Sequence, residues 1–327
     1  MKILVTGGTG FTGSHLVERL LDEGHKVVVL DNQNGIVYDR LAKKGADIHI
    51  GSVTDTELVR KLIPGCDVIH HLAAAFRKVN LPKNVYYETN VTSMRNLLRT
   101  AKENKVRKLV YCSTQGVHGN VDNPPGDEST PIKPEDYYQV TKWQGEEVCQ
   151  EFIKQGMDIT ILRPTALYGP GDPGRFLMMF KQVKKGMFPF FGSGKAFYHP
   201  VYVENFVDAH MLAMDKPAAK GQTYIIADEH YFTIKEIVLK IAKVMGIDLK
   251  VIHLPFLPIY WLSALVEFVF LPLPWDPPLF RRRADWFRQN RAFKIDKAKR
   301  DLGYIPKVDL DTGLKLTYDW YKAHGYL

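Results

Sequence analysis

A glycine-rich turn near the start of the chain is the feature that most restricts its fold. Residues 1–6 form a short apolar run, glycines interrupt it at Gly7, Gly10 and Gly13, and residues 14–21 continue with helical spacing. A buried strand that passes through glycines into a helix lets the backbone approach a pyrophosphate. The helix N-terminus then offers free N–H groups to the phosphates. The sequence therefore predicts a dinucleotide site at this turn.

Asp31 indicates which dinucleotide binds. It ends the next apolar run, residues 25–31, where a carboxylate can accept hydrogen bonds from ribose hydroxyls. The same negative charge repels the 2′-phosphate of NADP. Residues 32–34 are Asn-Gln-Asn and supply no arginine that would neutralise such a phosphate. The predicted cofactor is NAD.

The pattern of apolar runs predicts an α/β fold with a doubly wound, Rossmann-type parallel sheet. Strand-like and helical runs alternate up to about residue 165, which is typical of a parallel sheet covered on both faces. Runs at 201–203 and 223–226 indicate a return to that sheet. The predicted NAD-binding domain is 1–165 plus about 199–228, and the predicted substrate lobe, smaller and mostly helical, is 166–198 and 229–327.

Composition restricts location and partners. The three cysteines include no Cys-x-x-Cys pair, which argues against a disulfide framework. The first strand begins at residue 2 and leaves no room for a signal peptide, so we expect a cytoplasmic protein. The net charge of +8 is mild, and a solvated basic helix face explains it better than nucleic-acid binding. No metal site is predicted, because His70 and His71 are consecutive in a strand and face opposite sides.

The segment 254–280 is strongly apolar. Six prolines and Glu267 interrupt it, so no part approaches the roughly 20 residues that span a bilayer. Such a segment can be protein core, the wall of an apolar substrate pocket, or a contact with a membrane surface. We favour core or pocket wall over membrane contact.

The sequence Tyr138-Gln-Val-Thr-Lys142 is a second motif with candidate catalytic residues. Side chains four residues apart on a helix share one face, so the phenol and the ammonium project in the same direction. A free tyrosine has a pKa of about 10, and a nearby positive charge favours the phenolate and makes it a usable base. Tyr137 would point to another face. Tyr138 is therefore the candidate general base.

Two hydroxyls, Ser113 and Thr114, follow the predicted strand at residues 109–112. Open parallel sheets bind ligands at the carboxyl ends of their strands. A hydroxyl at that edge can hydrogen-bond a substrate carbonyl or alkoxide beside Tyr138. The predicted chemistry is hydride transfer at a secondary alcohol or ketone, in which Tyr138 takes the hydroxyl proton.

Together these motifs resemble the extended branch of the short-chain dehydrogenase/reductase superfamily, over essentially the whole chain. That branch includes NAD-dependent epimerases and dehydratases and 3-beta-hydroxysteroid dehydrogenase-like enzymes. The matching segments are residues 6–13, Asp31, 71–74, Asn90-Val91 with 96–98, 110–114 with 117–119, Tyr138 with Lys142, and 162–170.

The resemblance implies a catalytic triad of Thr114, Tyr138 and Lys142, with Lys142 also holding the nicotinamide ribose. The predicted NAD contacts are Gly7, Gly10, Phe11, Thr12, Gly13, Asp31, Asn32, Ser52, Val53, Leu72, Ala73, Ala74, Asn90, Tyr138, Lys142, Pro164 and Ala166. The predicted substrate contacts are Phe76, Ser113, His118, Tyr168 and His199. The chain departs from the family pattern at Ser52-Val53, where relatives often carry an aspartate near the adenine, and at His118, where many carry tyrosine. The resemblance also implies a homodimer through helices near 84–104 and 137–155.

Two branches of the superfamily compete for the substrate. Residues 201–213 and 293–304 are similar to the hydroxysteroid and sterol dehydrogenases, and the stretch before Val201 lacks the arginine with which nucleotide-sugar enzymes grip a diphosphate. Conversely, residues 169–172 and 281–283 suit a nucleotide sugar. We favour a dehydrogenase of a lipophilic alcohol or ketone. The alternatives are a UDP-sugar 4-epimerase or dehydratase with tightly bound NAD, and a non-catalytic NAD-binding regulator.

Overall fold

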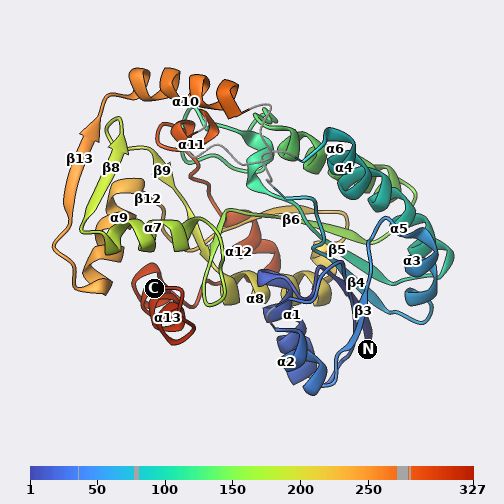
Figure 1. The fold of residues 1–327 in the computed structure, drawn as a ribbon. Helices are drawn as coiled ribbons and strands as arrows, with labels where there is room; N and C mark the ends of the chain where they lie inside the picture. Colours follow the sequence, from blue (N-terminus) through green and yellow to red (C-terminus); the bar gives the residue numbers. More distant parts are fainter. Residues whose placement is uncertain (36, 77–80, 271–278, 280) are drawn as a thin grey trace.

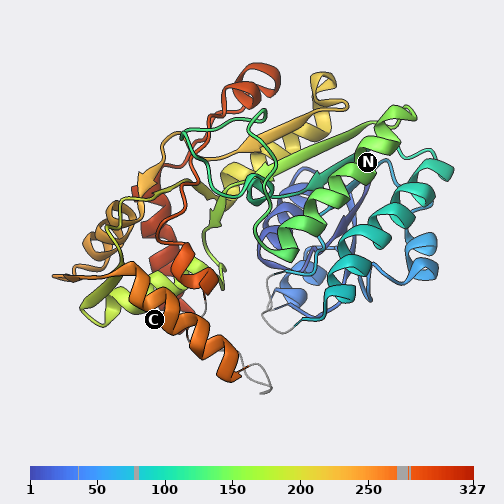
Figure 2. The same ribbon diagram turned by 90° about the horizontal axis from the view of Figure 1, so that it is seen from above.

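The structure is a computed structural model that describes residues 1–35, 37–76, 81–270, 279 and 281–327. Figures 1 and 2 show a larger part built around a parallel sheet and a smaller part on the side of β8, β13 and α13. Both parts contribute to the candidate site.

The central sheet has seven parallel strands in the order β11-β6-β5-β4-β1-β2-β3. The chain starts in the middle at β1 and moves outwards on one side to β3. It then returns to the other side of β1 with β4, so the two halves diverge between β1 and β4. This arrangement confirms the predicted Rossmann-type fold. The strands are β1 (Lys2–Thr6), β2 (Lys26–Asp31), β3 (Asp47–Ile50), β4 (Val68–His71), β5 (Lys108–Cys112), β6 (Ile159–Pro164) and β11 (Thr223–Ile226).

Helices cover both faces of the sheet because successive strand side chains point to opposite sides. In β1, Leu4 packs in the cluster formed with α3, α5 and α6, whereas Ile3 and Val5 pack in the cluster formed with α1 and α8. The helices of this part are α1 (Phe11–Asp22), α2 (Tyr38–Lys43), α3 (Thr56–Leu62), α4 (Lys83–Tyr87), α5 (Ser93–Glu103), α6 (Tyr137–Lys154), α8 (Val203–Asp215) and α12 (Asp296–Leu302).

The segment expected as one helix near 84–104 contains a π-helical turn, η1 (Glu88–Thr92), between α4 and α5. Such turns insert an extra residue into a helix and are frequent at functional sites. Here the turn buries Asn90, whose side chain reaches across to α6.

The smaller part combines short strand pairs with helices. Its strands are β7 (Ala166–Tyr168) paired with β10 (Pro200–Tyr202), β8 (Met187–Phe191) paired with β13 (Lys250–Leu254), and β9 (Phe197–Tyr198) paired with β12 (Phe232–Thr233). Its helices are α7 (Arg175–Lys184), α9 (Ile234–Met245), α10 (Phe256–Phe270), α11 (Arg281–Asp285) and α13 (Leu310–Ala323).

Two expectations about this region need correction. The run 201–203 does not rejoin the central sheet, because β10 pairs only with β7, and β11 alone returns. For the apolar segment beginning at Leu254, the expectation of core is wrong, because within α10 only Ser263 is buried, whereas the alternative of a pocket wall agrees with Tyr260 and Glu267, which line a pocket. The later positions 271–278 and 280 of that segment lie outside the described residues. Among the described helices, none has the length and apolar character needed to cross a membrane.

Candidate active site

The glycine turn lies directly against the loop that follows β4. Gly7 has a φ of +73°, and a Cβ there would lie 2.8 Å from the backbone nitrogen of Ala73. A Cβ on Gly13 would lie 2.0 Å from the carbonyl oxygen of Gly7, so α1 approaches β1 at a distance that only glycine permits. The turn and the loop of Leu72, Ala73 and Ala74 therefore form two sides of a cradle at the carboxyl edge of the sheet.

Asp31 is the last residue of β2 and stands at the same edge. Its carboxylate accepts a hydrogen bond from the backbone N–H of Thr9, 3.0 Å away, and the residue is buried. This bond fixes the carboxylate beside the glycine turn. The glycines of the turn leave space for the phosphates of NAD and expose backbone N–H groups that can donate to them, and the Asp31 carboxylate can accept hydrogen bonds from ribose hydroxyls.

Asn90 connects the far side of this edge to α6. Its amide oxygen accepts from the backbone N–H of Ala75 at 2.8 Å, and its Nδ2 donates to the hydroxyl of Thr141 at 2.9 Å. Thr141 in turn donates to the carbonyl of Tyr138 at 3.0 Å. The loop after β4 and the first turns of α6 are thereby held together.

Tyr138 and Lys142 lie on one face of α6 and are both buried. The ammonium of Lys142 donates to the carbonyl oxygen of Cys112 at 2.6 Å and lies 4.2 Å from the ring centre of Tyr111. Burial lowers the pKa of Lys142 to about 8. The lysine is thus fixed over the end of β5, and it carries its charge near neutral pH.

Thr114 stands at the same strand end. It precedes the 3-10 turn η2 (Gln115–His118), and its hydroxyl accepts from the backbone N–H of Gly116 at 3.0 Å. A Cβ on Gly116 would come within 3.2 Å of the side chain of Gln139, so this turn packs closely on α6. The end of β5 and the start of α6 therefore meet, as the sequence predicted. Phe76 adds an exposed ring whose centroid lies 5.1 Å from that of Tyr138, edge to face.

Two predicted substrate contacts, Ser113 and His118, belong to a buried network beneath this site. Ser113 donates to the carboxylate of Glu146, which also accepts from Arg163 at 2.5 Å. Arg163 lies 3.0 Å from Nε2 of His118, whose Nδ1 faces the carbonyl of Thr130 at 2.7 Å. Burial and the nearby Arg163 guanidinium lower the pKa of His118 to about 4, so the ring is neutral. These side chains hold β5, β6 and α6 together.

The other predicted substrate contacts, Tyr168 and His199, are buried in the smaller part. Tyr168 stacks on Phe176 with 4.6 Å between ring centres, and His199 Nε2 lies 2.8 Å from the carbonyl oxygen of Asp228. Neither of these two contacts involves a residue of α6.

Five further predicted NAD contacts lie beside the glycine turn or after strands of the central sheet. Phe11 and Thr12 begin α1 after the turn, Asn32 follows β2, Pro164 ends β6 and Ala166 begins β7.

Ser52 and Val53 follow β3, the outermost strand on the β2 side. The Ser52 hydroxyl lies 2.7 Å from that of Thr54, and Val53 is buried in the core cluster. Ser52 and Val53 therefore lie at the same edge of the sheet as Asp31, one strand further out.

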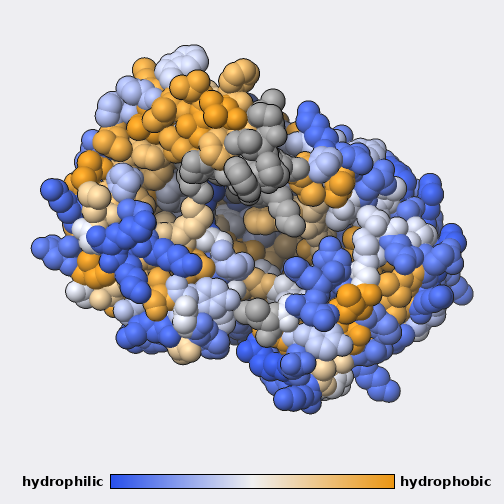
Figure 3. Space-filling view, viewed as in Figure 1, coloured by the Kyte–Doolittle hydropathy of each residue, from blue (hydrophilic) through white to orange (hydrophobic). Residues whose placement is uncertain are grey.

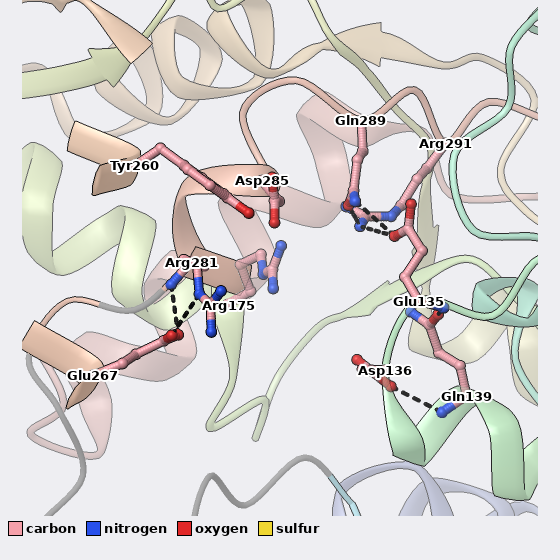
Figure 4. Close-up of a pocket in the computed structure, with 10 residues that line it drawn as sticks. All are labelled: Glu135, Asp136, Gln139, Arg175, Tyr260, Glu267, Arg281, Asp285, Gln289 and Arg291. Carbon is pink, nitrogen blue, oxygen red and sulfur yellow. Dashed lines mark hydrogen bonds and ion pairs between the residues drawn. The ribbon is translucent and has the colours of Figure 1, made fainter. Parts of the chain in front are cut away.

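A pocket of about 270 Å³ opens beside the first turn of α6. Figure 4 shows its two walls facing each other, one with α10 and α11 and the other with α6 and the chain near Arg291. Glu267 and Arg281 form an ion pair at 2.7 Å on the first wall. The lining residues are Glu135, Asp136, Gln139, Arg175, Tyr260, Glu267, Arg281, Asp285, Gln289 and Arg291.

Sequence reasoning missed most of these pocket residues. Asp136 caps α6 by accepting from the backbone N–H of Gln139 at 2.8 Å, and this capping pattern just before Tyr138 was a local signal that could have been used. Arg175 and Gln289 come from distant segments, and no spacing rule brings them together. Arg281 was predicted only within residues 281–283, as cations that suit a nucleotide sugar.

Comparison with known proteins places the chain among related sequences and structures. Residues 3–227 match the model of the NAD dependent epimerase/dehydratase family. The decarboxylating sterol-4-alpha-carboxylate 3-dehydrogenase of Candida albicans is 31% identical over 98% of this chain and 97% of its own length. The N-acetyl-alpha-D-glucosaminyl-diphospho-ditrans,octacis-undecaprenol 4-epimerase of Escherichia coli O157:H7 is 29% identical over 78% of this chain and 76% of its own. The crystal structure of UDP-glucuronic acid 4-epimerase from Bacillus cereus in complex with NAD has a TM-score of 0.81 and 25% identity, with 99% of both chains covered.

Proposed function

The chain belongs to the NAD-dependent epimerase/dehydratase family, and from this premise we propose that it is a dehydrogenase acting at a secondary alcohol or ketone of a lipophilic substrate. Membership confirms the predicted superfamily, the extended short-chain dehydrogenases/reductases, and the prediction of an NAD-dependent enzyme. Our proposal goes further in one respect: it chooses an oxidoreductase with net turnover of NAD over an epimerase.

The observation that carries the proposal is that arginines in the pocket lie beside carboxylates. Arg281 pairs with Glu267 at 2.7 Å, and Arg291 lies 3.9 Å from the carboxylate of Glu135. A diphosphate would also meet four carboxylates that line the same pocket and repel its charge, those of Glu135, Asp136, Glu267 and Asp285. The α10 helix contributes Tyr260 and Glu267 to this pocket, and its exposed apolar side chains are not among the lining residues. The similarity to the Candida albicans sterol dehydrogenase over nearly the whole chain agrees with this choice.

We assign the acid–base role to Tyr138, with the phenol oxygen as the atom that takes the proton of the substrate hydroxyl. The Lys142 ammonium would favour the phenolate, since its buried charge lies on the same helix face. Thr114 would hydrogen-bond the substrate oxygen. Bound NAD supplies the hydride acceptor for this chemistry.

The cradle fits NAD on its own geometry. Gly7 and Gly13 leave the backbone bare where added side-chain atoms would collide with neighbouring backbone, and Asp31 is positioned for ribose hydroxyls. We therefore propose residues 1–165 and the segment from α8 to β11 as the NAD-binding part, with α12 packed on it, and the smaller part as the part that holds the substrate. We propose Asn90 as a support for the loop of Ala73 and Ala74 as well as a cofactor contact.

A UDP-sugar 4-epimerase remains the second candidate. Its support is the structural likeness to the Bacillus cereus epimerase over 99% of the chain and the presence of Arg175 in the pocket. Both candidates would begin by oxidising a secondary alcohol, so Thr114, Tyr138 and Lys142 serve either one.

The test is to incubate the purified protein with NAD and, separately, with 3-hydroxysterols and with UDP-sugars. We expect a hydroxysterol to give a ketone product with net formation of NADH, which is measured by its absorbance. The Tyr138→Phe variant serves as the control for adventitious activity. Interconversion of UDP-sugars without net NADH would overturn the dehydrogenase proposal in favour of the epimerase.

We also propose that the protein is a cytoplasmic homodimer formed through the helices near 84–104 and 137–155. The exposed bidentate pair of Arg95 on α5 with Glu151 on α6 lies on the surface that such an interface would use. Sedimentation of the purified protein gives the oligomeric state directly.

A further inference from the structure

A loop between β7 and α7 bridges the two parts of the molecule. It comprises residues 169–174, and Figure 1 shows it between α1 and α13. A Cβ on Gly171 would lie 3.7 Å from the ring of Phe11, the first residue of α1, and 4.0 Å from the ring of Trp320 on α13. Figure 3, in the same view, shows the surface hollowed between the two parts. We call residues 169–174 the bridging loop.

His15 ties α1 to the bridging loop and to α8. Its Nε2 lies 2.9 Å from the carbonyl oxygen of Pro170, and its Nδ1 lies 2.6 Å from the carboxylate of Glu204 on α8. The imidazole also meets the ring of Phe11 edge to face, with 5.8 Å between centroids. The His15 side chain is 15% exposed, so little water competes for these contacts. One histidine thus contacts the loop, α8 and the residue that begins α1.

Both atoms that face the His15 ring can only accept hydrogen bonds. The Pro170 oxygen is a backbone carbonyl. Burial would raise the pKa of Glu204, but the hydrogen bonds and charges of His15 and Arg19 lower it below its ordinary value, so this group is a carboxylate. A neutral imidazole has one N–H donor, whereas an imidazolium has two. Only the protonated His15 ring can therefore donate to both partners.

The charges around Glu204 decide which bond survives when the His15 ring loses its proton. Arg19, one turn further along α1, contacts Glu204 at 3.0 Å and Asp208 of α8 at 2.7 Å. Lys307 also contacts Asp208 at 2.7 Å. Arg19 therefore keeps the Glu204 carboxylate beside the ring, and a hydrogen bond to a carboxylate is stronger than one to a neutral carbonyl. The remaining proton stays on Nδ1, and the bond to the bridging loop is the one that is lost.

We propose that His15 is a positioning residue for NAD, which in its protonated state holds the bridging loop against Phe11 beside the glycine turn. Loss of the Nε2 proton places a nitrogen lone pair against the Pro170 carbonyl oxygen, so the loop is released and NAD binds more weakly. The effect on NAD rests on the cofactor cradle proposed above, which includes Phe11. The attachment of the loop rests on the geometry of His15 alone.

The first measurement follows amide hydrogen exchange of the bridging loop in the NAD-free protein at pH 6.0 and pH 8.5, corrected for the intrinsic pH dependence of exchange. The test variant is His15→Gln, because glutamine keeps an N–H donor and does not titrate. The matched control is His25→Gln, between α1 and β2 at the opposite edge of the sheet. Asp172→Asn removes the titratable side chain of the loop itself. Thermal unfolding checks that each variant is folded.

We expect the wild type, His25→Gln and Asp172→Asn to lose about tenfold in loop protection at the higher pH, whereas His15→Gln changes by less than about twofold. Loop protection that does not depend on pH in the wild type would overturn the proposal. A pH dependence that persists in His15→Gln and disappears in Asp172→Asn would also overturn it, because the titrating group would then be Asp172.

Calorimetric titration with NAD at the same pH values tests the effect on the cofactor. The dissociation constant should rise by about tenfold between pH 6.0 and pH 8.5 in the wild type and in His25→Gln, and by less than about twofold in His15→Gln. By linkage, NAD binding to the wild type should take up protons near pH 7, measured from the dependence of the binding enthalpy on the buffer. Loop protection that depends on His15 without any binding of NAD would overturn the proposed cofactor site and, with it, the positioning role.

Discussion

Two helices border the candidate pocket from opposite sides, and they are anchored very differently. The α6 helix buries side chains along its length, among them Tyr138, Lys142 and Glu146, and it is tied to β5, β6 and η1. The α10 helix buries only Ser263 and contacts the rest of the protein through one face. The groups assigned to catalysis thus sit on a rigid element, whereas the substrate wall sits on a lightly anchored one. Changes in α10 should alter which substrate binds more than how fast it reacts.

The largest expected effect is on the side of α6. The Tyr138→Phe variant should lower kcat by about 10³-fold, because it removes the group that takes the substrate proton, while NAD affinity stays nearly unchanged. Steady-state kinetics and NAD titration measure the two quantities. Tyr137→Phe, which alters the neighbouring phenol packed edge-on against Tyr86, is the matched control. Equal activity of the two variants would remove Tyr138 as the base.

The second effect concerns how α6 is held. Glu146→Gln should lower the free energy of unfolding by about 3–5 kcal/mol, because it leaves the buried guanidinium of Arg163 without its countercharge. Urea unfolding measures the change. Glu151→Gln on the same helix breaks the exposed pair with Arg95 and should cost about 1 kcal/mol or less. A similar cost for both would show that the buried network does not anchor α6.

The third effect concerns the smaller part of the molecule. Asp172 precedes α7, and its Oδ1 accepts from the backbone N–H of Gly174 at 2.7 Å. Burial raises its pKa to about 7, so the folded protein retains a proton that the unfolded chain loses above about pH 4. The contribution of Asp172 to the free energy of unfolding should therefore fall as the pH rises from about 4 to about 7. Asp172→Asn should remove this contribution, so the variant should become more stable relative to the wild type over this range, by about 2–4 kcal/mol at pH 8.

Chemical unfolding across this pH range tests the Asp172 prediction. The control is Asp309→Asn, at the start of α13, where a hydrogen bond from the backbone of Thr312 lowers the pKa of the carboxyl. Its contribution is present at neutral pH and is lost only in acid, so it should not reproduce the change between pH 4 and 7. A stability difference between the wild type and Asp172→Asn that stays constant from pH 4 to pH 8 would contradict the assignment.

The smallest effect is expected in α10 itself. Glu267→Gln breaks the partly exposed pair with Arg281 and should change the free energy of unfolding by about 0.5 kcal/mol or less. Because both residues line the pocket, KM should change while kcat stays within about twofold of the wild type. A loss in kcat as large as that of Tyr138→Phe would show that α10 takes part in the reaction.

Local sequence patterns were sufficient to predict the features that depend on neighbours in the chain. The glycine turn needs close backbone approach at Gly7 and Gly13, and the spacing of Tyr138 and Lys142 places them on one helix face. The ends of parallel strands necessarily share one edge, which brought Asp31 and Thr114 to the site region. The fold followed from the same alternation of strands and helices.

Other features depend on contacts between distant segments and left no local signal. Ser113 donates a hydrogen bond to Glu146, and His118 lies within hydrogen-bond distance of Arg163. The sequence around Ser113 or His118 does not predict these partners. The apolar sequence of α10 is compatible with burial or exposure, and only the packing of Phe256 and Ser263 decides which face is covered. The pairing of β10 with β7 rather than with the central sheet is decided by the same kind of tertiary contact.

The position of β11 in the sheet has a consequence for how the protein is made. Six of the seven central strands lie within residues 2–164, but the strand that pairs with β6 on its outer side begins only at Thr223. A ribosome releases the chain from its N-terminus, and domains begin to fold during synthesis. Until Thr223–Ile226 emerges, β6 presents an unpaired edge to solvent, and unpaired edges are templates for aggregation. The interval between residues 164 and 223 is therefore the stage of synthesis at which a chaperone would protect this chain most effectively.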